Sequence, residues 1–211
     1  LPPAGAASEG NEIRAPGPGE VRLFQRGGQD PLAAPAGGKV TAAKPDPAKP
    51  DDPMKLTYIT YGVSTGGGHM YVNTKTKSAS FFESVRVLNM PCDDPNVQID
   101  LDEVLNHLPE GAMYLRADRL NVVDHGDKNK SQQEMTAKGH VTVQAKDFWG
   151  HSDTLTYNEA KDQIIFEGGE NGLATLYKQK QRGAEPQRIE GKTIIYIRST
   201  GMFKIEGGEW I

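Results

Sequence analysis

The side chains best able to do chemistry are thinly spread over this sequence. Its five histidines do not pair at the spacing that metal ligands take, and they stand at His69, His107, His125, His140 and His151. The sequence also contains no Gly-x-Gly-x-x-Gly or Walker pattern that would cradle a phosphate. We therefore expect no metal site and no cofactor.

The carboxylates and the single cysteine have structural explanations. Asp118 and Asp153 stand at equivalent places near the starts of two expected strands, which is typical of a turn or a cap. Four more aspartates lie beside Pro95 or at the start of an expected helix, where carboxylates favour turns and helix N-termini: Asp93, Asp94, Asp100 and Asp102. Cys92 is alone, so no intrachain disulfide can form, and no histidine stands beside it. We predict that the protein is not an enzyme.

Composition narrows the class of protein further. The 211 residues are enough for one domain of ordinary size, and the mean hydropathy is −0.59. No apolar run approaches the roughly 20 residues that a membrane-spanning helix needs. With 24 basic against 28 acidic residues and no basic stripe, we expect no nucleic-acid partner. The chain starts at Leu1 and its pattern starts and stops inside repeats, so we expect a piece of a longer protein.

The elements that must position any site are repeated. Residues 151–169 align without a gap on residues 190–208, with five identities: Thr154/Thr193, Tyr157/Tyr196, Glu167/Glu206, Gly168/Gly207 and Gly169/Gly208. Residues 117–122 match 152–157 as a looser third copy, whose extra residues fall in a polar hairpin tip at 124–133. A repeat of this length is typical of stacked units that bury their apolar faces against one another.

Each repeat predicts a hairpin of two short strands. Because side chains alternate between the faces of a strand, Leu155, Tyr157, Ile164 and Phe166 share one face of the first hairpin. Ile194, Tyr196, Phe203 and Ile205 are their equivalents in the second. The opposite face is mostly polar, with Ile165 and Ile195 as exceptions. Gly139, Gly168 and Gly207 each follow an apolar strand, so we interpret them as turn or bulge positions.

The rest of the chain divides by composition. Residues 1–24 contain an alternating segment that predicts a strand, which we interpret as the end of an upstream β repeat. Residues 25–53 are rich in Pro, Gly and Ala and predict a disordered-like linker or long loop. Residues 54–211 alternate at period two and predict one β domain. One short helix interrupts it, capped by Asp100 and ended by Pro109, and we expect it over an edge or an end of the sheet.

Parts of the repeats resemble a known family. Gly150-His151-Ser152, then Tyr-Asn-Glu-Ala-Lys-Asp at 157–162 and an aliphatic strand ending in Gly168, are similar to the OstA-like domain. Residues 189–196 fit that family's Ile-x-Gly-(Asp/Lys)-x-Ile-x-Tyr strand. The chain thus resembles the LptA family of lipopolysaccharide-transport proteins, which is related to LptC and to the N-terminal domain of LptD. The resemblance covers residues 114–208 and is weaker over 54–90.

This resemblance implies an architecture and a setting. The implied fold is an all-β, antiparallel jelly roll, a folded-over V-shaped sheet around an apolar groove. Copies of such domains join end to end through exposed strand edges. The implied ligand is lipopolysaccharide or a related lipid, and the implied location is the periplasm of a Gram-negative-type envelope, with outer-membrane association as a further expectation. The linker, the helix and the insertion at 124–133 depart from the minimal family pattern and leave the partners and the lipid open.

Two functions remain after these exclusions. The first is a lipid transport bridge for outer-membrane biogenesis, which holds acyl chains in the groove without making or breaking a bond. The second is a closed structural or assembly module that docks partners through its edge strands, in which case the same side chains are simply core. The groove candidates are Leu120, Val122, Leu155, Tyr157, Ile164, Phe166, Ile194, Tyr196, Phe203 and Ile205.

Overall fold

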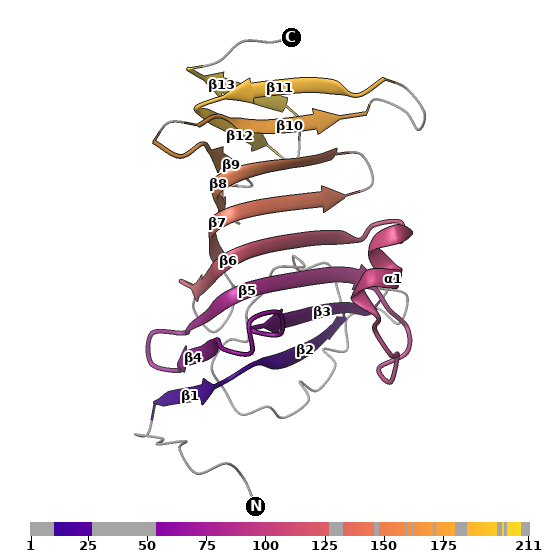
Figure 1. Ribbon diagram of the computed structural model, residues 1–211, viewed down its shortest axis with the longest axis vertical. Helices are drawn as coiled ribbons and strands as arrows, with labels where there is room; N and C mark the ends of the chain where they lie inside the picture. The colour runs from indigo at the N-terminus through magenta and orange to yellow at the C-terminus, as the bar shows by residue number, and fades with distance from the viewer. Residues whose placement is uncertain are drawn as a thin grey trace, which may run out of the picture.

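The protein is built on one large antiparallel sheet with a single short helix beside it. The computed structural model describes residues 11–26, 54–126, 133–145, 148–158, 160–161, 163–170, 172–179, 185–197, 200 and 202–207. Within these residues, thirteen strands pair in a single sheet, stacked along the long axis of the molecule (Figure 1). The expected all-β fold is confirmed.

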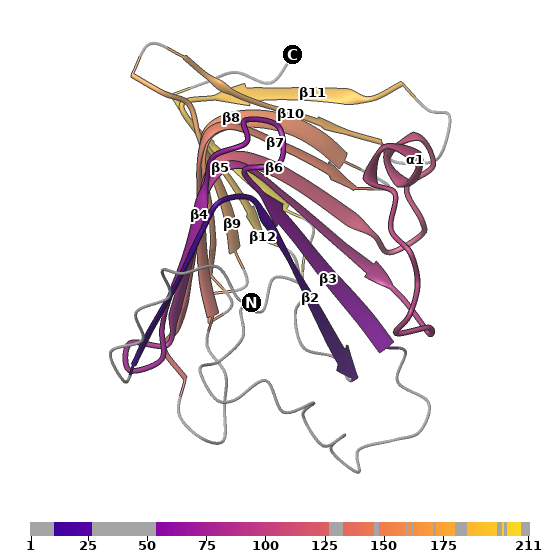
Figure 2. The ribbon, with the colours of Figure 1, turned by 60° about the horizontal axis from the view of Figure 1, so that its bottom comes forward.

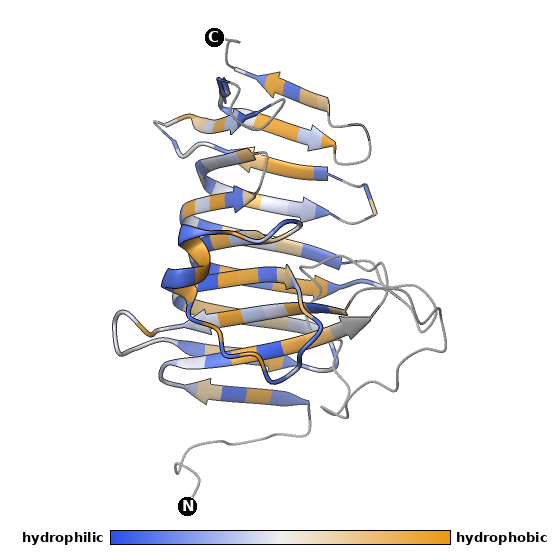
Figure 3. Cartoon of the chain, turned by 90° about the vertical axis from the view of Figure 1, so that its right-hand side faces the viewer, coloured by the Kyte–Doolittle hydropathy of each residue, from blue (hydrophilic) through white to orange (hydrophobic). Residues whose placement is uncertain are grey.

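The strands follow one another with few interruptions. Their bounds are β1 (Glu12–Pro16), β2 (Gly19–Arg26), β3 (Met54–Tyr61), β4 (His69–Asn73), β5 (Ser78–Pro91), β6 (Met113–Asp124), β7 (Gln133–Ala145), β8 (Phe148–Asn158), β9 (Gln163–Glu167), β10 (Ala174–Lys178), β11 (Gln187–Gly191), β12 (Thr193–Ile197) and β13 (Met202–Glu206). The helix α1 (Leu101–Asn106) lies between β5 and β6. Hydropathy alternates along many of these strands, as a sheet with one buried face requires (Figure 3).

The sheet is folded into a V because its central strands bend. The pairing register shifts between Phe82 and Val85 in β5, between Arg116 and Arg119 in β6, and across residues 138–141 in β7. Bulges of this kind bend a strand and increase its twist. Gly139 adopts a φ of 78° at the bulge in β7, which confirms its predicted role as a bulge position.

The bends divide the sheet into two arms, visible in Figure 2 as the two sides of the V. We call the first arm the path β1-β4-β5-β6-β7-β8-β9-β12-β13, which uses the halves 78–82, 119–124, 133–138 and 154–158 of the long strands. The second arm consists of β2, β3, the other halves of β5–β8, and then β10 and β11. The inner faces of both arms contribute to one large core.

The helix begins where the sequence predicts but lies elsewhere on the sheet. Asp100 caps α1, since its carboxylate accepts hydrogen bonds from the backbone N–H groups of Asp102 and Glu103. The expected position over an edge or an end of the sheet is wrong. Instead, the helix and the segment before it cover the outer face of the second arm, where Leu101 and Val104 pack on a small second core (Figure 2). That core exists because β3 and β5 carry apolar side chains on both faces, Leu56 and Leu88 among them.

The structure describes only part of the residues on which the expected domain division depends. β1 and β2, at 12–26, pair with β4 and β3 in the same sheet as the rest of the chain. Residues 25 and 26 of the expected linker belong to β2, and residues 27–53 lie outside the described part. The domain boundaries therefore stay a prediction.

Candidate functional site

Two parallel rows of apolar side chains run across the inner face of the first arm. The strand registers align Ala15, Met70, Phe81, Leu120, Ala137, Leu155, Phe166, Ile194 and Ile205 in the row nearer the fold of the V, which we call the deep row. The shallow row, nearer the mouth of the V, contains Ile13, Val72, Ala79, Val122, Met135, Tyr157, Ile164, Tyr196 and Phe203. Both rows cross all nine strands of the arm.

The ten side chains named from the sequence all fall in these rows, five in each. The two repeated hairpins form as predicted: Leu155 pairs with Phe166 in β8–β9, and Ile194 pairs with Ile205 in β12–β13. β9 and β12 then join the hairpins, with Phe166 opposite Ile194. The shared face is therefore continuous from one repeat to the next.

The second arm supplies the facing wall, and sequence reasoning missed it as part of the site. Its inner face presents Val21, Ile59, Val87, Leu115, Val143, Leu176 and Ile189 in one register row. Gly150 stands in this row because a Cβ there would overlap the carbonyl oxygen of Thr175 and the side chain of Leu176. The period-two alternation at 54–61 and 141–145 predicts strands there. Alternation does not indicate which arm of the sheet a strand joins.

Aromatic contacts join the two arms at both ends of the interior. Tyr61 of the second arm meets Phe81 of the first, with ring centroids 5.7 Å apart. At the C-terminal end, Phe148 of the second arm lies 5.8 Å from Tyr196 of the first. Tyr196 in turn stacks on Phe203 at 4.6 Å. Contacts between aromatic side chains of the two arms therefore help to hold the arms together.

Burial of the rows changes along the molecule. In the middle, the deep row is fully enclosed, with Leu155, Phe166 and Ile194 exposed by 2%, 1% and 0%. Toward the C-terminal end, Phe203 and Ile205 are only partly buried, and at the N-terminal end Ile13 is 50% exposed. The apolar surface is therefore packed by its own side chains in the centre and open to solvent at both ends.

Polar groups mark the limits of the interior. Toward the mouth, Thr57 and Asn89 of the second arm are buried, and the Asn89 side-chain amide donates to the Thr57 hydroxyl over 3.0 Å. On the first arm, the buried Asp124 carboxylate accepts from the backbone N–H of Gly126 over 2.8 Å. Deep in the second arm, the Ser152 hydroxyl is buried, and no hydrogen bond to it is found in the described part of the chain.

One cation faces the apolar surface at its C-terminal end. The Lys178 ammonium of β10 lies 4.9 Å from the ring centroid of Phe203 and 5.7 Å from that of Tyr196. A lysine over aromatic faces is attracted by their electron density. Lys178 thus reaches from the second arm to the first.

The side chains considered for catalysis lie apart from this interior. His140 and Asp118 form a pair at 2.8 Å across the bulge of β6 and β7, but the side chains are 90% and 59% exposed. His69 stacks on Phe82, and Cys92 donates its thiol hydrogen to the carbonyl of Asp94. Among the described residues, no group of three or more potential ligands could hold a metal ion. None of the described helices is long and apolar enough to cross a membrane.

Comparison with known proteins gives one family model that matches part of the chain. Residues 107–202, from the end of α1 to the start of β13, match the family model described as "LptA/(LptD N-terminal domain) LPS transport protein". No curated protein matches the chain. The matched segment contains the copies at 117–122 and 151–169, most of the copy at 190–208, and eight of the ten groove candidates. The resemblance to the OstA-like/LptA family is therefore confirmed for this segment.

Proposed function

We propose that this protein, whose residues 107–202 match the LptA/(LptD N-terminal domain) LPS transport family, carries lipid between two membranes. The lipid is lipopolysaccharide or a close relative, with its acyl chains against the two rows of the first arm and its polar part in water. The protein works in the periplasm as a bridge toward outer-membrane assembly. No bond of the lipid changes, so the protein acts by binding alone.

The continuity of the two rows carries this proposal. An acyl chain moving along the arm meets aliphatic, methionine or aromatic side chains at every strand crossed, from Ile13 to Phe203. Each methylene removed from water gains about 0.8 kcal/mol. The lining is similar from strand to strand, and the charge described above, that of Lys178, stands at the C-terminal end of the rows. This arrangement suits passage along the arm rather than tight binding at one point.

The ends of the sheet suit assembly into a longer path. Within the described residues, β1 and β2 each pair on one side only, as do β11 and β13 at the other end. Unpaired strand edges accept further strands through backbone hydrogen bonds. We propose that a related domain adds to these edges, because the apolar rows reach the edge strands and are partly exposed there. Such pairing would extend both rows into the next unit.

Site-specific photo-crosslinking tests the proposal. A photoreactive phenylalanine analogue at Phe203 or Tyr157 should crosslink to added lipopolysaccharide, because both side chains lie in the shallow row. The same analogue at Lys204 or Thr156, the outward neighbours on the same strands, should give at most a few per cent of that yield. Equal yields at inward and outward positions would show that the lipid binds elsewhere.

The enclosed centre favours a second candidate, a closed assembly module. In that case the side chains of the rows serve only as a core, and function resides in the edge strands. Extraction of the purified protein followed by mass spectrometry separates the two. Copurified acyl lipid in stoichiometric amount supports the bridge, whereas lipid-free protein that still assembles end to end supports the module.

A further inference from the structure

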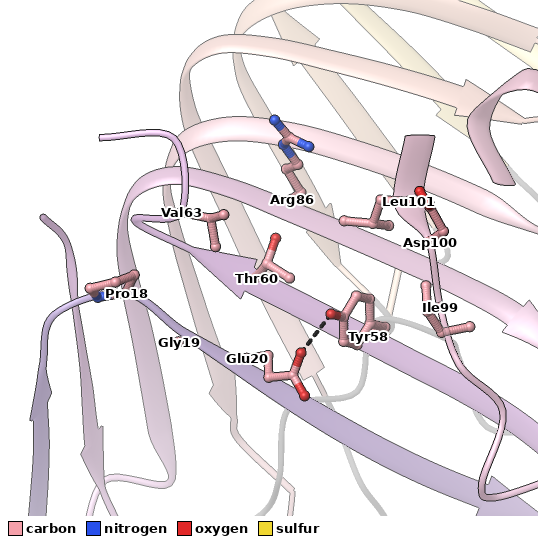
Figure 4. A pocket seen from close by; sticks show the side chains of 10 residues that line it. All are labelled: Pro18, Gly19, Glu20, Tyr58, Thr60, Val63, Arg86, Ile99, Asp100 and Leu101. Carbon is pink, nitrogen blue, oxygen red and sulfur yellow. Dashed lines mark hydrogen bonds between the residues drawn. The ribbon is translucent and has the colours of Figure 1, made fainter. Parts of the chain in front are cut away.

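The outer face of the second arm holds a pocket that the lipid proposal does not use. It has a volume of about 600 Å³ and lies between β2, β3, β5 and the segment that leads into α1 (Figure 4). Glu20, Thr60 and Arg86 form one register row across its floor. They point away from the interior, since their chain neighbours Val21, Ile59 and Val87 belong to the inner core. The pocket and the apolar rows are therefore on opposite faces of the sheet.

Two arginines meet at the inner end of this row. Arg86 of β5 stands directly opposite Arg116 of β6 in the strand register, which puts their Cβ atoms about 5 Å apart. Like charges in opposite positions destabilise a sheet. In the part of the chain that the structure describes, Arg116 is exposed and no ion pair involves it. The fold thus places two guanidinium groups together where repulsion works against it.

The groups that could compensate these arginines are few and loosely placed. Arg86 lies 3.8 Å from the carboxylate of Asp102, whose side chain is 89% exposed. It also donates to the hydroxyl of Ser64 over 3.2 Å. A single contact at 3.8 Å is not the two-pronged pairing that a guanidinium makes with a well-placed carboxylate. Arg86 therefore has one loosely placed and exposed carboxylate beside it.

The other carboxylates of the pocket have partners of their own. Glu20 accepts from the Tyr58 hydroxyl over 2.7 Å and lies 3.4 Å from Arg22. Asp100 is occupied by the backbone N–H groups at the start of α1. Burial raises the pKa of Tyr114, while the charges of Arg86 and Arg116 act in the opposite direction. Glu20 and Asp100 are therefore held by other groups, and Asp102 is the carboxylate beside Arg86.

We propose that this pocket binds a phosphate monoester group at its Arg86 end, through Arg86, which lines the pocket, and Arg116, which stands beside Arg86 in the strand register. The phosphate takes the place of the Asp102 carboxylate and lies between the two guanidinium groups, whose planar forks match its oxygens. The rest of the ligand contacts the apolar wall of Val63, Ile99 and Leu101. The volume falls within the range of about 300–1,000 Å³ typical of small-molecule sites. The ligand is thus a phosphorylated molecule with an apolar portion.

Nuclear magnetic resonance of the isotope-labelled full chain tests this assignment. The probes are inorganic phosphate, monomeric dihexanoyl phosphatidic acid and, as the uncharged control, dihexanoylglycerol. The phosphorylated lipid should shift the backbone amide signals of Thr60, Val63 and Leu101, and dihexanoylglycerol should not. If inorganic phosphate shifts the same signals, the site recognises the phosphate whatever its source. If only the lipid does, the site also needs the apolar part; both results support the proposal.

Matched variants separate the site from general electrostatic attraction. Arg86→Gln should weaken binding of the phosphorylated lipid by at least about tenfold, because a hydrogen-bonded charge is lost. Arg116→Gln should weaken it several-fold, and it tests the same site at an exposed position if the Arg86 variant fails to fold. Arg119→Gln removes the same charge from the same strand and should leave affinity within about twofold.

Two results would overturn the assignment. One is equal weakening by Arg116→Gln and Arg119→Gln. The other is a set of shifts confined to interior residues such as Ile59 and Leu115, which would place the lipid between the arms. That second result would leave the proposed lipid bridge standing, so the two proposals fail separately.

Discussion

Replacing Phe166 by alanine distinguishes a lipid route from a closed core. Phe166 is 1% exposed and lies in the deep row between Leu155 and Ile194. Removal of a buried phenylalanine side chain costs about 3–5 kcal/mol. At about 2–4 °C per kcal/mol for a chain of this size, the melting temperature should fall by about 6–20 °C. Ile165→Ala is the matched control, because this side chain points outward from the same strand and its loss should cost about 1 kcal/mol.

The informative measurement is recovery in the presence of lipid. If acyl chains pass between the arms, the space left by Phe166 admits about four more methylenes, worth about 3 kcal/mol. Thermal melting with and without lipopolysaccharide should therefore show a larger lipid-induced rise for Phe166→Ala than for the wild-type protein or for Ile165→Ala. An equal rise in all three proteins, or no rise in any, would refute the reasoning that the interior is the lipid route.

Three further predictions follow from single side chains. Ser152→Ala should raise the free energy of unfolding by about 1 kcal/mol in urea titrations, because it removes a buried hydroxyl for which the described chain offers no hydrogen bond; a loss of stability would imply a partner for that hydroxyl. Asp100→Ala removes the cap of α1 and should cost about 1 kcal/mol, seen as faster thiol labelling of the buried Cys92, with Asp93→Ala as the control that leaves labelling unchanged. Burial raises the pKa of Tyr61, so its stabilising contribution is complete below its ordinary pKa near 10 and is lost as the pH rises toward the folded-state pKa. Wild-type stability should therefore decline above pH 10, and Tyr61→Phe should decline less steeply; parallel curves would count against this cause.

The first arm could be predicted from the sequence because its signal is local and repeated. The alignment of residues 151–169 with 190–208 places Leu155 and Ile194 at the same step of two hairpins. In a sheet, equal steps on successive strands produce a continuous row. The ten candidates therefore lie together, and the register between β9 and β12 follows from the pairing of two like hairpins.

The second arm could not be predicted because its geometry depends on bends without a clear sequence mark. Glu83 and Ser84 adopt φ values of 69° and 49° at the bend of β5, a conformation for which glycine is the usual signal. In β6 the alternation also changes phase, because Ala117 and Leu120 on either side of the register shift both belong to the inner core, so a count read through that bend assigns side chains to the wrong face. The opposition of Arg86 and Arg116 likewise arises from pairing between segments far apart in sequence, so no local pattern announces the outer pocket.

The strands that cross the fold of the V determine how easily the angle between the two arms can change. β5 to β8 each run through both arms as a single strand, so in the centre the angle between the arms is held by covalent backbone as well as by packing. Toward either end the arms are built from separate strands. At the N-terminal end the first arm has β1 and β4 and the second arm has β2 and β3; at the C-terminal end the first arm has β9, β12 and β13 and the second arm has β10 and β11. We therefore expect the angle between the arms to be stiff in the centre of the molecule and more easily changed at its two ends. A series of such units would bend at the junctions between units and keep the apolar rows straight within each unit.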